Sequence, residues 1–154
     1  MKTSKRPTTG KLFAGDRGFD PVTITMQIVA LQFAYYSSLL ACVGLTDLCI
    51  GLRPHLAQIF TSLPYADLSL NYGHSTLFAH WINVPFVVLC QALIVEKASK
   101  CLDFTVTILF VHFACMWLYD GGYPGWQFSF WVQQIAWATA TCLLAEALCM
   151  KLET

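Results

Sequence analysis

Four long apolar stretches constrain this chain more than any other feature of its sequence. Each is close to the ~20 residues that a helix needs to cross the core of a bilayer. They predict membrane spans over residues 22–46, 74–95, 98–119 and 127–149. We expect a helix in each, because a chain surrounded by lipid must satisfy its own backbone hydrogen bonds.

The composition also indicates that lipid surrounds much of this chain. Of the 154 residues, 56% are hydrophobic and only 12% are charged, which lies outside the usual range for a soluble domain. We therefore predict an all-α polytopic membrane protein, with four transmembrane helices in a compact bundle over residues 21–150. The third apolar run itself starts only at Leu102, so its helix should begin earlier, with Ser99 as the N-cap.

The basic residues predict the orientation of this bundle, since short loops rich in Lys and Arg remain in the cytosol. Among the nine Lys and Arg residues, only Arg53 lies in the connection 47–73. The others lie before the first span, between the second and third apolar runs, or after the fourth span. Both termini and an N-terminal arm over residues 1–20 are therefore expected in the cytosol, and 47–73 forms a lumenal loop.

The lumenal loop contains one candidate helix, with the sequence RPHLAQIFTSL. Pro54 stands where a first helical residue is favoured. The apolar residues of the segment fall on one side: Leu56, Ile59, Phe60 and Leu63. We expect a short amphipathic helix that lies on the lumenal surface of the membrane.

Small residues indicate which faces of the first and fourth spans pack in the bundle, because they let helix backbones approach closely in lipid. At 100° per residue, one stripe of the first span contains Gln27, Ala30, Ala34, Ser38 and Ala41. The fourth span has a small-residue row of Ala136, Ala140 and Ala147 beside a more polar row of Thr139, Cys142 and Glu146. We expect these stripes to face the bundle.

The second and third spans carry polar residues of their own. A stripe on the second span, beside the kink expected at Pro85, consists of His80, Asn83, Val87 and Gln91. Two interpretations are open, hydrogen bonds to neighbouring helices or the lining of a cavity. On the third span, His112 shares a face with Thr105 and should bond to a neighbouring helix, since the sequence identifies no partners for a metal site or a proton relay.

Two carboxylates lie near the predicted cytosolic ends of their helices. Asp103 belongs to the first turns of the third span, where the helix dipole favours an anion and where Lys97 and Lys100 are near. Glu146 stands five residues before Lys151. Acids within membrane spans usually face protein or water, so both are candidates for a functional surface.

Cysteine usage is less informative. None of the seven cysteines has the spacing of a zinc site. Most are expected to pack as small apolar residues. Palmitoylation is the alternative for Cys101 and Cys149, which lie near the cytosolic interface.

Several of these residues belong to a recognisable pattern. The segment KCLDFTVT over residues 100–107, followed by His112 and by EALCMK over 146–151, resembles the Sys family of Golgi integral membrane proteins. Weaker matches occur in the right order: FDP at 19–21, QIV at 27–29, YYSSL at 35–39 and QIF at 58–60. The resemblance implies a four-span protein of the trans-Golgi. It also implies recruitment of an Arf-like small GTPase whose N-terminus is acetylated, in support of vesicle tethering and protein transport.

The resemblance gives the acids a candidate role. If they lie at the cytosolic end of the bundle with Gln27 and Gln91, then Asp103 and Glu146 would rim a pocket for the amphipathic N-terminal helix of the GTPase. The loop that carries Lys97 and Lys100 is a further candidate for the docking surface. Helix capping is the competing explanation for Asp103.

Two other classes of function stay open. A small dimeric four-helix transporter would need a carboxylate near the bilayer midplane rather than at its edge. An enzyme would need a nucleophile with a base, or a metal cluster, and the sequence offers neither. We therefore expect a non-enzymatic receptor with no cofactor and no metal, whose partners are the GTPase and the lipid bilayer rather than nucleic acid.

Overall fold

The computed structural model describes residues 20–66, 69, 71–121 and 127–153. The predicted N-terminal arm therefore lies outside the described residues, apart from Asp20. The four long helices are α1 (Pro21–Ile50), α4 (Asn71–Val95), α5 (Cys101–Asp120) and α6 (Phe128–Glu153). Two short helices, α2 (Ala57–Phe60) and α3 (Leu63–Ala66), follow α1, and the 3₁₀ turn η1 (Ala98–Lys100) precedes α5.

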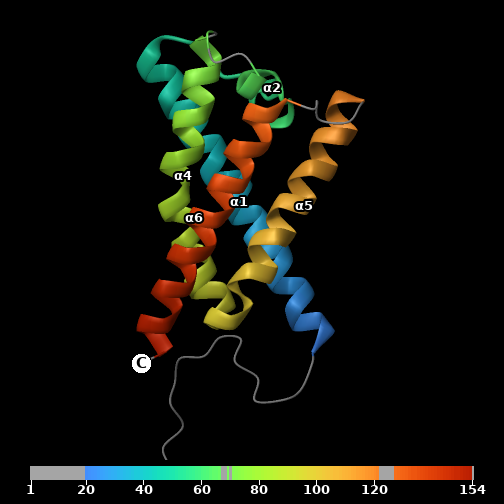
Figure 1. Ribbon diagram of the computed structural model, residues 1–154, viewed down its shortest axis with the longest axis vertical. Helices are drawn as coiled ribbons and strands as arrows, with labels where there is room; N and C mark the ends of the chain where they lie inside the picture. Colours follow the sequence, from blue (N-terminus) through green and yellow to red (C-terminus); the bar gives the residue numbers. More distant parts are fainter. Residues whose placement is uncertain (1–19, 67–68, 70, 122–126, 154) are drawn as a thin grey trace, which may run out of the picture.

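All four long helices are long and apolar enough to cross a membrane, with mean hydropathies between 1.4 and 1.8 for their most apolar windows. They pack together into one bundle (Figure 1). The predicted all-α class with four apolar helices is confirmed. At ~1.5 Å per residue, the 30 residues of α1 span ~45 Å, more than the ~30 Å of a bilayer core, so α1 must tilt or project.

The two ends of the bundle differ. At one end lie the start of α1, the turn between α4 and α5, and the end of α6 (Figure 1). We call this the terminal end. At the opposite end, which we call the loop end, α2 and α3 lie beside the start of α4 and the end of α5. Almost all predicted site residues belong to segments near the terminal end.

Both ends of α1 follow from local chemistry. Asp20 is the N-cap: its carboxylate accepts hydrogen bonds from the Val22 N–H at 3.1 Å and the Thr23 hydroxyl at 2.7 Å. The bond from Thr23 holds the pKa of the Asp20 carboxyl below its ordinary value. Gly51 ends the helix with a φ of 80°, a conformation that costs glycine little. The loop therefore starts at Gly51, and residue 47 is helical.

The packing face of α1 is not the predicted small-residue stripe. Its buried residues are Leu31, Tyr35, Leu39, Cys42, Val43 and Asp47. Ala30 and Ala41 are exposed, and Gln27, Ala34 and Ser38 are only partly buried. Large side chains fill the space against α4, so the contact does not need the close backbone approach that small residues permit.

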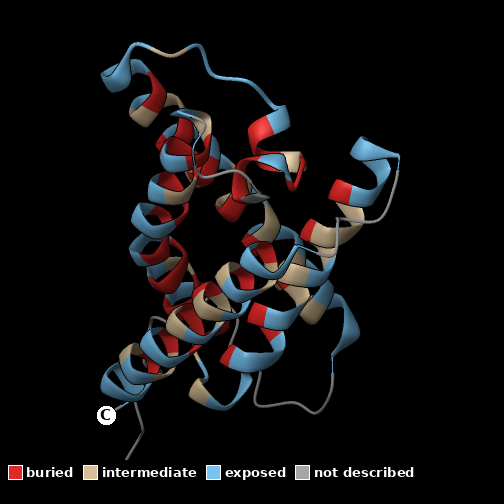
Figure 2. Cartoon of the chain, turned by 45° about the horizontal axis from the view of Figure 1, so that its top comes forward, coloured by how far each residue is buried: buried red, intermediate tan, exposed pale blue. Residues whose placement is uncertain are grey.

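The prediction for α6 was wrong for a similar reason. The buried residues of this helix are Phe130, Gln134, Trp137, Thr141, Cys142, Ala145 and Cys149. Cys142 is the one member of the two predicted rows among them, while Thr139 and Ala147 are exposed. A broad aromatic side chain, Trp137, fills the centre of the contact. Figure 2 shows the buried residues gathered on the sides of the helices that face one another.

The start of α5 also differs from the prediction. Ser99 lies inside η1 rather than at the N-cap position, which Lys100 occupies without a side-chain hydrogen bond. The 3₁₀ turn meets the need for capping through the backbone, since the Lys100 N–H donates to the Lys97 carbonyl at 3.1 Å. Glu96, with a φ of 58°, marks the reversal of the chain after α4.

The loop segment that was expected to lie on the membrane surface packs into the bundle instead. It forms two short helices, because the backbone at Thr61 is extended. Ile59 is 1% exposed, and the Phe60 ring lies 5.7 Å from that of Tyr36 on α1. Only Leu56 and Leu63 of the predicted apolar side are exposed. Residues 57–66, which we call the plug, therefore pack against the long helices at the loop end.

Candidate functional site

Two side-chain amides, one partly buried and one fully buried, hold the helices together near the terminal end. The Gln27 side chain donates to the Ile94 carbonyl at 2.9 Å. This bond satisfies a carbonyl of the last turn of α4, which has no partner within its own helix. The Gln91 amide, 0% exposed, donates to the Thr105 hydroxyl at 2.9 Å and so joins α4 to α5. Both predicted site residues thus contact neighbouring helices.

The charged candidates lie closer to the surface. Asp103 is in the first turn of α5 and is exposed, as are Lys97 and Lys100 in the preceding turn. Glu146 is partly buried on α6, where one of its carboxylate oxygens lies 3.9 Å from the Cys142 thiol. The chain therefore presents charges of both signs beside the junction of α4, α5 and α6.

The start of α5 and the end of α6 are in direct contact. The thiols of Cys101 and Cys149 lie 3.6 Å apart, and these residues are 0% and 1% exposed. The Ala98 N–H donates to the Glu153 carboxylate at 3.1 Å. Burial removes both thiols from an acylating enzyme, so the structure favours packing over the palmitoylation alternative at Cys101 and Cys149.

The polar stripe predicted on α4 is buried as a whole. His80, Asn83, Val87 and Gln91 are each at most 2% exposed. His80 bonds to the Tyr65 hydroxyl of α3, with Oη 2.9 Å from Nδ1, and more weakly to the Tyr35 hydroxyl of α1, 3.5 Å from Nε2. Hydrogen bonds to other segments therefore account for His80 and Gln91. Pro85 lies within the same helix.

His112 bonds to a neighbouring helix, as predicted. Its Nδ1 lies 3.4 Å from the Tyr36 hydroxyl, and its ring centroid lies 6.2 Å from that of His80. It shares its buried face with Thr105, which is 1% exposed. Within the described ranges, no group of three or more His, Cys, Asp or Glu residues could hold a metal ion.

Asp47 and Tyr65 are among the buried polar residues that the sequence interpretation missed. Asp47 is 0% exposed, and its carboxylate accepts a hydrogen bond from the Ser75 hydroxyl of α4. Gly51 was the available signal, since a glycine after an apolar run commonly ends a helix and would have extended α1 past residue 47. Tyr65, which bonds to His80, is in contact with a residue 15 positions away, and the sequence gives no signal of that contact.

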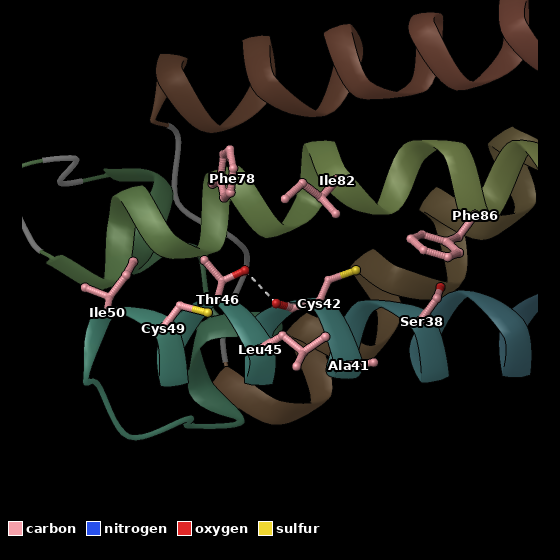
Figure 3. Close-up of a pocket in the computed structure, with 10 residues that line it drawn as sticks. All are labelled: Ser38, Ala41, Cys42, Leu45, Thr46, Cys49, Ile50, Phe78, Ile82 and Phe86. Carbon is pink, nitrogen blue, oxygen red and sulfur yellow. Dashed lines mark hydrogen bonds between the residues drawn. The ribbon is translucent and has the colours of Figure 1, made fainter.

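A pocket of about 440 Å³ lies between α1 and α4 in the half of the bundle nearer the loop end (Figure 3). Its lining is formed by Ser38, Ala41, Cys42, Leu45, Thr46, Cys49, Ile50, Phe78, Ile82 and Phe86. The hydroxyls of Ser38 and Thr46 bond to carbonyls of their own helix at 2.8 and 2.6 Å. The pocket thus offers apolar contact, and it includes none of the predicted site residues.

The fold and the buried polar contacts define a polytopic helical membrane protein. The SYS1 family, described as an integral membrane protein S linking to the trans Golgi network, matches residues 15–154. The chain belongs to this family, as the resemblance at 100–107 predicted. It is therefore an integral membrane protein linked to the trans-Golgi network.

Two curated relatives are similar over most of the chain. A Protein SYS1 homolog of Dictyostelium discoideum is 30% identical over 144 residues, which are 92% of this chain and 60% of that protein. A Protein SYS1 homolog of Nematostella vectensis is 32% identical over 135 residues, covering 88% of this chain and 84% of the relative. The chain thus spans less than two thirds of the Dictyostelium relative. No solved structure matches it.

Proposed function

We propose that this protein is a Golgi membrane receptor, which recruits an Arf-like small GTPase with an acetylated N-terminus to the trans-Golgi. The recruited GTPase then supports vesicle tethering and protein transport. The observation that carries the proposal is the match of residues 15–154 to a family of integral membrane proteins linking to the trans-Golgi network. Such a link requires a surface that faces the cytosol.

The terminal end of the bundle is the proposed cytosolic surface. Lys97, Lys100 and Lys151 all belong to segments near this end, and short basic segments remain in the cytosol. The same rule assigns the loop end, with Arg53, to the lumen. In selectively permeabilised cells, epitope tags at both termini should accordingly be reached by antibody while the Golgi lumen remains sealed.

The docking surface is built from the charged residues around the α4–α5 turn. Asp103, Lys97 and Lys100 are exposed there, and Glu146 is partly buried on the adjacent α6. An amphipathic helix binds a receptor through its apolar side, with specificity from polar groups at the edge. We assign Gln27 and Gln91 a positioning role, because their hydrogen bonds hold α1, α4 and α5 behind this surface.

The chemistry of the partner explains why a receptor is needed. One fatty acyl chain gives only marginal membrane binding, and an acetylated N-terminus carries no fatty acyl chain at all. An amphipathic helix alone would leave the GTPase largely in solution. A protein surface that binds the same helix supplies the missing free energy.

Co-flotation tests this function directly. The full chain is reconstituted in liposomes and incubated with an acetylated Arf-like GTPase, or with the same GTPase lacking its N-terminal helix. The acetylated form should float with receptor liposomes and remain soluble with empty ones. Equal recovery of the acetylated form on both kinds of liposome would contradict the proposal.

The transporter alternative gains no support from the positions of the acids. In the described helices the carboxylates lie toward helix ends, and the buried one, Asp47, is three residues from the end of α1. A transporter would place its coupling acid near mid-membrane. The receptor therefore remains the better account.

A further inference from the structure

A group of buried polar side chains between α4, α5 and α6 lacks hydrogen-bond partners. We call it the polar seam, and it consists of Thr76, Asn83, His112, Gln134, Trp137 and Thr141. None of these residues is more than 2% exposed. At least one polar side-chain atom of each has no partner within the described part of the chain. Both amide atoms of Asn83 lack one, so the finding there does not depend on which atom is nitrogen.

Helix geometry brings these residues together. Gln134, Trp137 and Thr141 follow one another at intervals of three and four residues, so they share one face of α6. Thr76 and Asn83 likewise share a face of α4. The two helices are neighbours, because the Trp81 indole donates to Gln133 at 3.3 Å. The seam therefore follows the contact between α4 and α6.

Tyr35 of α1 closes the centre of the seam. Its ring lies 5.6 Å from that of Trp137 and 5.9 Å from that of His112, edge-on in both cases. It also reaches His80, at 3.5 Å. The rings of Trp137 and His112, from α6 and α5, thus lie around one side chain of α1, and each ring carries an unpartnered nitrogen.

A polar group buried without a partner is costly, and lipid provides no partner. Elsewhere the same bundle forms direct bonds, such as Gln91 to Thr105 at 2.9 Å. The seam atoms therefore need partners that neighbouring side chains do not supply. The Trp137 N–H can only donate, the Asn83 oxygen can only accept, and the Thr141 hydroxyl does both. A cation would satisfy only the acceptors and an anion only the donors, whereas water satisfies both.

We infer that ordered water molecules bind in the polar seam and bridge α4, α5 and α6. Buried waters in proteins bond to about three such groups each. Two further buried polar residues, Gln58 and Thr61, lie at the loop end. Toward the terminal end, Val88, Ala92 and Ala145 are buried, and the Gln91 amide bonds directly to the Thr105 hydroxyl.

Hydroxyl-radical labelling tests the presence of this water. The purified full chain in nanodiscs is exposed to a millisecond X-ray pulse, which generates radicals from water, including bound water, and oxidation is located by mass spectrometry. Trp137 and Met116 are both 1% exposed, and Met116 packs with Phe130 and with Tyr65, whose hydroxyl already bonds to His80. We expect oxidation of Trp137 to be severalfold faster than that of Met116. Equal protection of the two would overturn the inference.

A substitution gives a second test, because the melting midpoint should fall if the seam holds water and should stay unchanged or rise if the seam is dry. Val keeps the shape of Thr and removes the hydroxyl. If Thr141 bonds to water, Thr141→Val should lower the melting midpoint by about 2–4 °C. In a dry seam, removal of an unpartnered hydroxyl would leave the midpoint unchanged or raise it, which would contradict the proposal. Thr139→Val is the matched control, because that exposed hydroxyl bonds to its own helix at 2.8 Å.

Discussion

The Gln91 amide of α4 donates to the Thr105 hydroxyl of α5 at 2.9 Å, and these residues are 0% and 1% exposed. Thr105 donates in turn to the Cys101 carbonyl at 2.8 Å. A chain of two hydrogen bonds therefore runs from α4 to the first turn of α5. It connects the interior of the bundle to the helix that presents Asp103.

The first prediction concerns the strength of the hydrogen bond between Gln91 and Thr105. Gln91→Leu should lower the free energy of unfolding by about 1 kcal/mol, because it removes the bond to Thr105. In a double-mutant cycle with Thr105→Val, the coupling should be about 0.6 kcal/mol, the mean for such bonds in membranes. The measurement is unfolding by SDS titration in mixed micelles. A coupling of zero would show that the two side chains do not interact.

The second prediction concerns the face of α1. Leu39 is 0% exposed in the core, so Leu39→Ala should lower the free energy of unfolding by about 2–5 kcal/mol. Ala34→Leu should cost much less, because residue 34 lies at the edge of the contact. The amount of folded protein, followed by size exclusion of a fluorescent fusion, ranks the two variants. The reverse ranking would restore the small-residue stripe as the packing face.

The third prediction uses the cysteines. The thiols of Cys101 and Cys149 lie 3.6 Å apart, so a mild oxidant should join them after a small movement. Mass spectrometry of the digested protein should find the peptides of these two residues linked. Cys49, which is exposed, should react with maleimide in the folded protein and serves as the control. Free labelling of Cys101 before denaturation would contradict the packing of α5 on α6.

The fourth prediction concerns the plug at the loop end. Burial raises the pKa of the Tyr65 hydroxyl well above its ordinary value, so it stays protonated as a partner for His80 over the usual pH range. Tyr65→Phe should weaken docking of residues 57–66 by about 1 kcal/mol. Hydrogen exchange should accelerate in that segment and remain unchanged in residues 101–104, at the start of α5. Unchanged exchange in residues 57–66 would show that the bond does not hold the plug.

The sequence predicted those parts of the fold that follow from lipid as the solvent. Apolar length predicted the four helices, and the cost of polar groups in lipid correctly placed His80 and Gln91 inside the bundle. The same reasoning could not find the face of α1, since the choice between small residues and Leu39 depends on how far apart the helix axes lie.

Contacts between residues that are distant in sequence limited how much of the remaining structure could be predicted. Nothing local to residues 57–66 reveals that Phe60 meets His112, whose ring centroid is 6.5 Å away. The predicted site residues are brought near one end, but their role depends on a partner surface that belongs to another chain. For that reason the assignment of Asp103 and Glu146 remains a prediction.

The central claim is that the carboxylates of Asp103 and Glu146 recognise the GTPase. Recruitment of the GTPase by a receptor that lacks these two charges tests it most directly. Asn and Gln keep the shapes of Asp and Glu, so Asp103→Asn combined with Glu146→Gln removes charge with little change in packing. Asp120→Asn is the matched control, because it removes an exposed carboxylate of α5 at the loop end and leaves Asp103 and Glu146 in place. The measurement is the fraction of the Arf-like GTPase at the Golgi in cells that express each variant at equal abundance. We predict that the double variant still reaches the Golgi while the GTPase becomes cytosolic. Normal recruitment of the GTPase by a normally abundant double variant would contradict the account.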